Sequence, residues 1–276
     1  MRSVLIRLHE KSDVVSHECD QSLLVGLPAW KGSKMATLRC HFATLMPDVD
    51  WCLYLDCDLL YLTSVEGHFA LRDDSVYACC VREESENARR AECTWINANT
   101  NCKVSADDYF NSGVVLFNLK KMREDAMPAK LMAFLGRYQD VPIPDQDALN
   151  ACMARHVKLI DPKFNRLQIF MTHEKFLGAG GAMDLSVSLD CLDGIDVVMH
   201  YVCGNPWTPQ YACVANGRFR LWQVVSQMFY TADAFCETAI VLPTEASTCR
   251  FIVFVDIAGH RQNPEWEIMA LDASRE

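Results

Sequence analysis

A short apolar run that ends in two acidic residues is the feature that most limits how this chain can fold. The run covers Trp51–Leu55, and Asp56-Cys57-Asp58 follows it directly. A run of this length, closed by acids, predicts a buried strand of an α/β protein. Open α/β sheets bind ligands beyond the carboxyl ends of their strands, so we expect a functional site at this point.

The spacing of Asp56 and Asp58 indicates what such a site could bind. Residues two apart on an extended backbone point to the same side, so both carboxylates can face one point in space. A hard divalent cation requires oxygen ligands arranged in this way, and we interpret the pair as a metal site beside a phosphorylated substrate. The structural alternative is an ordinary turn at the end of a strand.

Two further Asp-x-Asp motifs have different settings. The motif at residues 48–50 follows Pro47 and precedes the strand, where Asp is favoured because it hydrogen-bonds to local backbone in turns. The motif at residues 145–147 follows Pro144. We expect a helix to start there, with Asp145 placed to cap it.

Length and charge restrict the class of protein. The chain has 276 residues, a mass of 31.3 kDa and a hydrophobic fraction of one half, so it can bury a large core. We expect one α/β domain over residues 1–235 and a strand-rich appendage of unknown role over residues 236–276. The net charge of −10 argues against nucleic acid and anionic membranes as main partners, because both favour basic surfaces.

The cysteines and the first residues indicate a cytoplasmic protein. The chain has 14 cysteines but no Cys-x-x-Cys motif and no regular spacing, so we interpret them as reduced. The opening segment is interrupted by charge too early for a signal peptide, and no apolar run reaches the roughly 18 residues of a membrane span. We therefore expect at most peripheral association with the inner face of a membrane.

Hydrophobic periodicity predicts alternating strands and helices. The predicted strands cover residues 4–8, 51–55, 75–81, 109–118, 157–160, 196–201, 251–257 and 265–271. The predicted helices cover residues 33–45, 120–138, 145–155 and 219–229, and residues 13–24 are predicted as a helix or loop. The polar residues 82–108 are predicted as a long connection of low regularity.

Four of these segments together form a recognisable pattern. In chain order they are Asp-Cys-Asp at residues 56–58, Phe-Asn-Ser-Gly-Val at 110–114, Pro-Asp-Gln-Asp-Ala-Leu-Asn at 144–150 and His200-Tyr201. The arrangement resembles family 8 glycosyltransferases, which are retaining, metal-dependent enzymes that include lipopolysaccharide glucosyl- and galactosyltransferases and glycogenin. The resemblance covers roughly residues 27–207. It implies an α/β fold of the GT-A type, with a Rossmann-like mixed sheet flanked by helices.

The resemblance implies a metal site and its ligands. Asp56 and Asp58 match the family's metal-binding pair, and His200 matches its third protein ligand. The usual metal is Mn²⁺, with Mg²⁺ as the alternative. Carboxylates, one imidazole and the phosphate oxygens of a donor make a ligand set that suits Mn²⁺. Without the resemblance, a single His after an apolar strand would be interpreted as structural.

The resemblance also implies where a UDP-sugar donor would bind. Basic residues on the helix before the metal motif match donor contacts, although such residues are by default solvated. Amide and hydroxyl side chains at the end of a strand match the lining of the sugar site. The matching residues are Lys34 and Arg39 for the donor, Asn111, Ser112 and Gly113 for the sugar, and Gly204 for the phosphate.

Asp145 and Gln146 match the pair that the family places beneath the anomeric carbon. Retention of configuration needs either a covalent intermediate or attack by the acceptor hydroxyl on the same face. A carboxylate can serve as nucleophile, as in retaining glycosidases, but a Gln side chain is better suited to stabilising an oxocarbenium-like centre. We favour same-face attack.

The chain departs from the family pattern at two places. Asn205 stands where the family has a Lys that grips the diphosphate, and the spacing around Gly204 is altered. Only 55 residues precede Asp56, too few for the strand and helix that usually hold the uracil and ribose. The domain is therefore expected to be incomplete at its N-terminal side and to bind its donor weakly or not at all.

The combined interpretation is a Mn²⁺-dependent retaining hexosyltransferase. It would move glucose or galactose from a UDP-sugar to a glycan or a lipid-linked saccharide, as in lipopolysaccharide synthesis. One alternative is a non-catalytic remnant of the same fold that binds nucleotides or glycans. The other is a haloacid dehalogenase-type phosphatase with Asp56 as nucleophile, which leaves the remaining motifs without a role.

Overall fold

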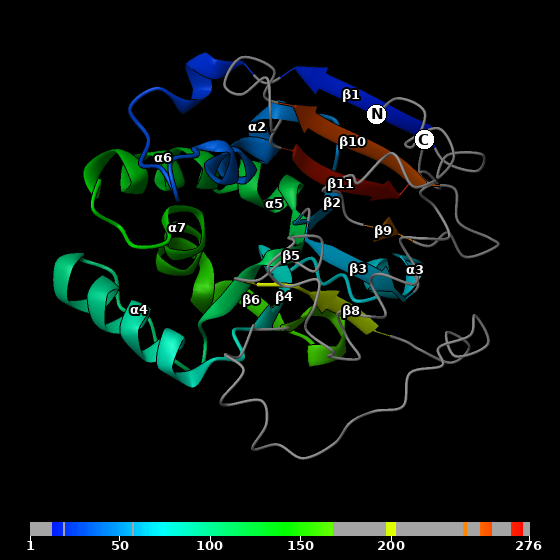
Figure 1. Cartoon of the computed structure of the whole chain (residues 1–276). Helices are drawn as coiled ribbons and strands as arrows, with labels where there is room; N and C mark the ends of the chain where they lie inside the picture. The colour runs from blue at the N-terminus through cyan, green and yellow to red at the C-terminus, as the bar shows by residue number, and fades with distance from the viewer. Residues whose placement is uncertain are drawn as a thin grey trace, which may run out of the picture.

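The computed structural model contains two β-sheets and a group of helices (Figure 1). It describes residues 13–18, 20–56, 58–63, 65–167, 197–202, 240–241, 249–255 and 266–272. The strands predicted over residues 51–55, 75–81, 109–118, 157–160 and 196–201 are present, with ends that differ by a few residues. The strand predicted over residues 4–8 and the helix predicted over residues 219–229 lie outside the described residues.

The larger sheet has seven strands and mixed directions. Its order is β1, β10, β11, β2, β5, β4, β6. The bounds are β1 (Asp13–Glu18), β10 (Cys249–Val255), β11 (Trp266–Asp272), β2 (Trp51–Leu55), β5 (Phe110–Asn118), β4 (Ala78–Arg82) and β6 (Val157–Leu159). The pairs β1 with β10 and β4 with β6 are parallel, whereas the other four pairs are antiparallel. This mixed sheet confirms the predicted α/β class.

The smaller sheet has four strands, in the order β7, β8, β3, β9. Their bounds are β7 (Arg166–Leu167), β8 (Val197–His200), β3 (Leu59–Leu62) and β9 (Ile240–Val241). β3 begins just after Asp58, and it pairs antiparallel with β8 so that Leu59 lies opposite His200. This pairing brings two segments that are far apart in the sequence to one place.

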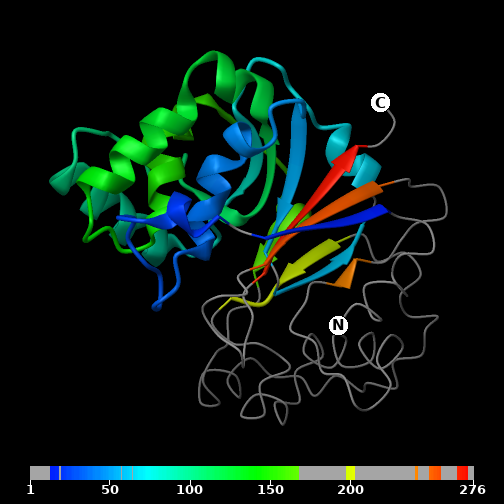
Figure 2. The ribbon, with the colours of Figure 1, turned by 90° about the horizontal axis from the view of Figure 1, so that it is seen from above.

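Helices cover one face of the larger sheet, and the smaller sheet lies on its other side (Figure 2). The α-helices are α2 (Phe42–Leu45), α3 (Val65–Phe69), α4 (Glu86–Asn99), α5 (Leu119–Glu124), α6 (Met127–Arg137) and α7 (Pro144–Met153). The 3₁₀ helices are η1 (Gln21–Leu24), η2 (Met35–His41), η3 (Ala154–His156) and η4 (Pro162–Asn165).

The alternation of side chains along β2 explains why this strand is apolar throughout. Cys52 and Tyr54 pack in the core beneath the helices, whereas Leu53 and Leu55 pack in a second core with β3 and α3. Successive side chains of a strand point to opposite faces, so a strand covered on both faces needs apolar residues at every position. All five residues of β2 are buried, and the partly exposed Asp56 follows directly after the strand.

Three predictions about helices and connections require correction. The connection over residues 82–108, predicted to be irregular, contains α4, a helix of 14 residues. The helix predicted over residues 33–45 is the 3₁₀ helix η2 followed by the single turn of α2. The helix predicted over residues 120–138 is divided into α5 and α6 at Ala126, which has a left-handed backbone with φ of 52°.

The prediction for residues 13–24 as a helix or loop is also wrong in part, because β1 is a strand and η1 is a 3₁₀ helix. Among the strands of the described residues, β1 lies at the edge of the larger sheet and pairs with β10. Residues 249–255 and 266–272 form two of the strands predicted near the end of the chain. Both strands join the larger sheet, where β11 pairs with β2 and β10 lies between β11 and β1. The division of the chain after residue 235 stays a prediction.

Candidate functional site

The end of β2 and the start of β3 position the two acids of the first motif. The N–H of Asp56 donates to the carbonyl oxygen of Gly113 on β5 (2.8 Å), which extends the β2–β5 ladder by one residue. The carbonyl oxygen of Asp58 accepts from the N–H of Tyr201 (2.9 Å), just beyond β8. Backbone pairing on both sides therefore fixes the two acids in space.

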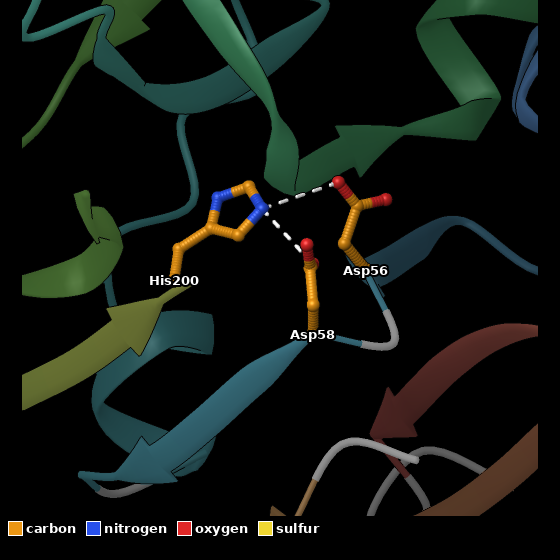
Figure 3. A group of neighbouring side chains, drawn as sticks. All are labelled: Asp56, Asp58 and His200. Atoms are coloured by element: carbon orange, nitrogen blue, oxygen red, sulfur yellow. Dashed lines mark ion pairs between the residues drawn. The ribbon is translucent and has the colours of Figure 1, made fainter. Parts of the chain in front are cut away.

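Asp56, Asp58 and His200 converge on one point (Figure 3). Each offers a ligand atom, and these atoms lie within 4.8 Å of one another. Nε2 of His200 lies 3.1 Å from a carboxylate oxygen of Asp58 and 3.5 Å from one of Asp56. Two carboxylates and one imidazole nitrogen suit a divalent cation such as Mn²⁺ or Mg²⁺. The structure thus brings together the three residues that the resemblance implied as metal ligands.

Exposure of these ligands is consistent with entry of a cation from one side. The imidazole is buried, with 4% of its side chain exposed, whereas the carboxylates of Asp56 and Asp58 are 25% and 23% exposed. Oδ1 of Asp58 lies 3.1 Å from Nε2 of His200 and accepts no other hydrogen bond from the described residues. A bound cation could therefore take the place of this one contact and coordinate both atoms.

Charged neighbours determine the protonation of Asp56. Burial alone would raise the pKa of this carboxyl, but the positive charges of Arg39 and His200 and a hydrogen bond from Tyr54 outweigh it, so the pKa lies below its ordinary value. Burial lowers the pKa of His200, but the charges of Asp58 and Asp56 act more strongly and raise it overall. The site therefore holds opposite charges even before a cation binds.

Arg39 connects the metal ligands to the second group of site residues. One guanidinium nitrogen donates to Asp56 (2.8 Å), and the other donates to the Ser112 carbonyl oxygen (2.8 Å) and forms an ion pair with Asp145 (3.1 Å). The guanidinium also lies over the ring of Tyr54, 4.0 Å from its centre, which is a cation–π contact. Arg39 is only 3% exposed, so it is a buried structural charge as well as a candidate donor contact.

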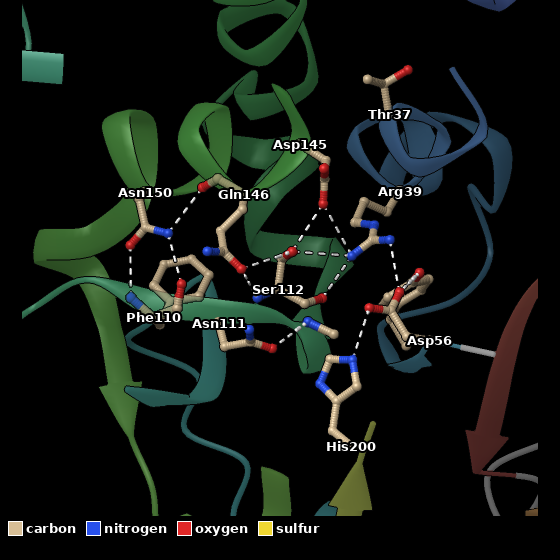
Figure 4. A network of polar contacts seen from close by, with 12 residues as sticks. Thr37, Arg39, Asp56, Phe110, Asn111, Ser112, Asp145, Gln146, Asn150 and His200 are labelled. Carbon is tan, nitrogen blue, oxygen red and sulfur yellow. Dashed lines mark hydrogen bonds and ion pairs between the residues drawn. The ribbon is translucent and has the colours of Figure 1, made fainter. Parts of the chain in front are cut away.

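Asp145 and Gln146 approach Ser112 from the first turn of α7 (Figure 4). The hydroxyl of Ser112 donates to the Asp145 carboxylate (2.9 Å), and its N–H donates to Oε1 of Gln146 (2.9 Å). Ile143, not Asp145, occupies the N-cap position of α7. The expectation that Asp145 caps the helix is therefore wrong, because its carboxylate is engaged by Arg39 and Ser112 instead.

Gly113 is required by the close approach of three segments. A Cβ atom added to it would lie 2.2 Å from Cε1 of His200 and 2.7 Å from a carboxylate oxygen of Asp56. Any larger residue would therefore displace the metal ligands. Gly is the residue that permits such close approach of a backbone to a ligand site.

The other predicted site residues have different placements. Nδ2 of Asn111 donates to the carboxylate of Glu83 (2.8 Å), so its side chain extends behind the metal ligands. Nζ of Lys34 donates to the carbonyl oxygen of Leu24 (3.3 Å), at the start of η2. This contact directs the Lys34 ammonium group to the end of η1. Gly204 lies outside the described residues.

Several residues of the site were not among the predicted site residues. They are Tyr54, Glu83, Tyr109, Asn150 and Asn165, all with hydrogen bonds to predicted site residues or their neighbours. Asn150 lies in the third motif, and its amide pairs with the backbone N–H and carbonyl of Phe110. Asn165 ends a 3₁₀ helix with no recognisable pattern, and only tertiary structure brings it beside His200.

The sequence of this chain is similar to a family model and to individual proteins. A family model described as "Glycosyl transferase family 8" matches residues 24–209. Lipopolysaccharide 1,2-glucosyltransferase of Escherichia coli is 28% identical over 120 residues, which cover 42% of this chain and 34% of that protein. General stress protein A of Bacillus subtilis is 25% identical over 138 residues, or 48% of this chain and 46% of that protein. The chain thus spans between a third and a half of the length of these relatives.

The fold comparison agrees with the mixed sheet described above. The crystal structure of the galactosyltransferase LgtC in complex with donor and acceptor sugar analogues superimposes with a TM-score of 0.54 and 22% sequence identity. The match covers 78% of this chain and 75% of LgtC. The resemblance in fold confirms the predicted GT-A-type architecture.

Among the helices of the described residues, none combines the length and the apolar character that crossing a membrane requires.

Proposed function

Because this chain belongs to glycosyl transferase family 8, we propose that it is a retaining hexosyltransferase. It moves glucose or galactose from a UDP-sugar to a hydroxyl of a glycan or lipid-linked saccharide. The observation that carries this proposal is the convergence of Asp56, Asp58 and His200 beside Arg39 and the start of α7. The names of the relatives, a lipopolysaccharide glucosyltransferase and a galactosyltransferase, support the choice of sugars.

The metal ligands would hold Mn²⁺, with Mg²⁺ as the alternative, against the diphosphate of the donor. When bound, the cation neutralises the charge that develops on the departing diphosphate. Asp56 is held ionised by Arg39, so a carboxylate rather than a carboxylic acid faces the cation. His200 contributes the softer nitrogen ligand, which favours Mn²⁺ over Mg²⁺.

The residues at the start of α7 would act on the sugar. The Gln146 amide is fixed at both ends, because Oε1 accepts from the Ser112 N–H and Nε2 donates to the hydroxyl of Tyr109 (3.2 Å). A fixed amide dipole stabilises an oxocarbenium-like centre without the cost of reorganisation. Asp145 is paired with Arg39 and is a weaker nucleophile for that reason. We therefore favour attack by the acceptor hydroxyl on the face that the diphosphate leaves.

Titration of UDP into the protein by calorimetry tests the donor site. Binding in the presence of Mn²⁺, which the departures from the family pattern lead us to expect to be weak, should disappear with EDTA and in the Asp58→Ala variant. Asp74→Ala is the matched control, because Asp74 is an exposed acid on a turn, and this variant should bind as the wild-type protein does. Binding of UDP that is independent of metal would contradict the proposed ligands.

Turnover separates a transferase from a binding domain of the same fold. The expected result is release of UDP from UDP-glucose or UDP-galactose, with Mn²⁺ present, and a product whose anomeric configuration by NMR equals that of the donor. Metal-dependent binding of UDP without turnover of either donor would favour the non-catalytic alternative. Hydrolysis of a generic phosphate ester that is lost in Asp56→Asn would favour the phosphatase.

A further inference from the structure

A chain of buried side chains leads from His200 away from the metal ligands. Nδ1 of His200 lies 3.0 Å from Oδ1 of Asn165, and Nδ2 of Asn165 donates to Oδ1 of Asn111 (2.8 Å). Nδ2 of Asn111 then donates to the carboxylate of Glu83 (2.8 Å). All four side chains are buried. Polar groups at such depth must satisfy one another, so the direction of each hydrogen bond is constrained.

The end at Glu83 fixes the orientation of Asn111. A carboxylate has only acceptor atoms, and that of Glu83 also accepts from the N–H of Ser85 (3.0 Å). Asn111 must therefore turn its NH₂ group toward Glu83 and its carbonyl oxygen away. The backbone N–H of Gly113 donates to that same oxygen (2.9 Å), which imposes the same orientation independently.

The orientation of Asn111 fixes Asn165, and Asn165 fixes His200. The carbonyl oxygen of Asn111 can accept only, so Asn165 presents its NH₂ group to it and its own carbonyl oxygen to His200. An oxygen that faces Nδ1 requires a proton on Nδ1. A neutral imidazole carries one proton, so the lone pair is left on Nε2, which faces Asp56 and Asp58.

We propose that Glu83, Asn111 and Asn165 are positioning residues that hold His200 in the tautomer with the proton on Nδ1. In this tautomer Nε2 is free to bind the divalent cation that Asp56 and Asp58 also bind. The proposal rests on the metal site of the proposed function, and it assigns a role to three residues that do not touch the cation. Hydrogen bonds to the second nitrogen of a metal-binding His generally set its tautomer and orientation.

The tautomer can be read by ¹⁵N NMR of the imidazole in metal-free protein, at a pH above the titration of His200. The wild-type protein is expected to show protonated Nδ1. In Asn165→Leu the acceptor is lost, and the proton is expected to move to Nε2, where the carboxylates accept it. Asn165→Asp loses the NH₂ group that faces Asn111 but keeps an acceptor oxygen beside Nδ1, so the proton is expected to stay on Nδ1.

Affinity for Mn²⁺, measured by calorimetry without nucleotide, gives the second readout. Asn165→Leu is expected to bind Mn²⁺ about 10- to 100-fold more weakly, as for other changes behind a metal ligand. Asn118→Leu is the matched control, because it also removes a buried Asn and can destabilise the protein, but Asn118 lies at the far end of β5. This variant should change neither the His200 tautomer nor the affinity for Mn²⁺.

The two readouts distinguish this inference from the proposed function. A proton on Nε2 in the wild-type protein, or an unchanged tautomer in Asn165→Leu, would overturn the role of Asn165 while leaving the metal site intact. A wild-type protein with protonated Nδ1 that binds no Mn²⁺ would overturn the proposed metal site and the purpose assigned to the tautomer.

Discussion

At the scale of single residues, one added carbon atom or one lost proton is expected to change the metal affinity or the stability of the protein. Gly113 and Asp147 are the two residues concerned. Because Gly113 has no side chain, the backbone of β5 can approach Asp56 and His200 closely. Asp147 is buried, and its carboxylate oxygens accept from the Tyr109 hydroxyl (2.7 Å) and the Ile143 N–H (2.9 Å).

Gly113→Ala is expected to displace the metal ligands. The added methyl group would meet the His200 ring and the Asp56 carboxylate, and overpacking of this kind costs about 1 to 3 kcal/mol. Affinity for Mn²⁺ should fall by at least about tenfold, which corresponds to about 1.4 kcal/mol. Gly136→Ala is the control, because a Cβ there meets nothing within 4 Å and Ala favours a helix. Equal Mn²⁺ affinity in both variants would contradict the close approach.

Asp147→Asn is expected to remove a pH dependence of stability. Burial raises the pKa of Asp147 to about 7, and the charges of Glu92 and Asp145 contribute. The folded protein keeps this proton when the unfolded chain, with its pKa near 3.8, has lost it. The contribution of Asp147 to the free energy of unfolding therefore falls as pH rises from about 4 to about 7, by up to about 1.4 kcal/mol per pH unit.

Denaturant unfolding at several pH values within this range measures the slope. The Asn side chain cannot ionise, so the contribution of Asp147 to the pH dependence of the free energy of unfolding should be absent in the variant. Asp74→Asn, at an exposed acid, should keep the wild-type slope. A variant that retains the full wild-type slope would show that Asp147 ionises near its ordinary pKa.

At the scale of elements, α4 shows what pattern analysis could not detect. The helix buries few of its residues, and Cys93 and Ile96 are the buried hydrophobic ones. A short apolar stripe among polar residues gives little periodicity to measure. Its local signals were the cap at Ser85, whose hydroxyl accepts from the Ala88 N–H (3.3 Å), and the ion pair of Glu86 with Arg90 four residues later. β2 was easier to predict, because cover on both faces makes every residue apolar.

Ser85→Ala is expected to lower the free energy of unfolding by about 1 kcal/mol, because the first turn of α4 loses its side-chain cap. Ser85→Asp keeps an acceptor oxygen at the same place and should retain most of the stability. Thermal or urea unfolding of the three proteins gives the comparison. A loss in Ser85→Asp as large as that in Ser85→Ala would mean that the cap does not stabilise this helix.

The candidate site was predictable to the extent that its residues lie in local patterns. The acids after β2, the Asn-Ser-Gly segment and the start of α7 each have a sequence signature. Asn165 and Glu83 have none, because their roles depend on which strands pair and on where η4 lies against β8. Contacts of this kind are a property of the tertiary structure, and a single sequence contains no period or spacing that reports them.

At the scale of the whole molecule, the larger sheet joins strands from both ends of the described sequence. β10 and β11 lie between β1 and β2. A chain truncated after residue 248 would leave β1 without its partner and would expose the edge of β2. Unpaired edges promote aggregation. We expect this truncated protein to bind a hydrophobic dye and to sediment as aggregates, whereas a chain that folds as a stable monomer would support the predicted boundary after residue 235.

The insertion of β10 and β11 beside β2 also has a consequence for the rate of folding. β2 meets β5 early along the chain, but its other neighbour becomes available only when residues 266–272 have left the ribosome. Pairings between residues so distant in sequence form slowly, because loop closure must precede the gain from contact. The nascent chain therefore holds β2, the strand that precedes the candidate metal site, at an open edge for most of its synthesis, and slow closure of the sheet prolongs its exposure to aggregation.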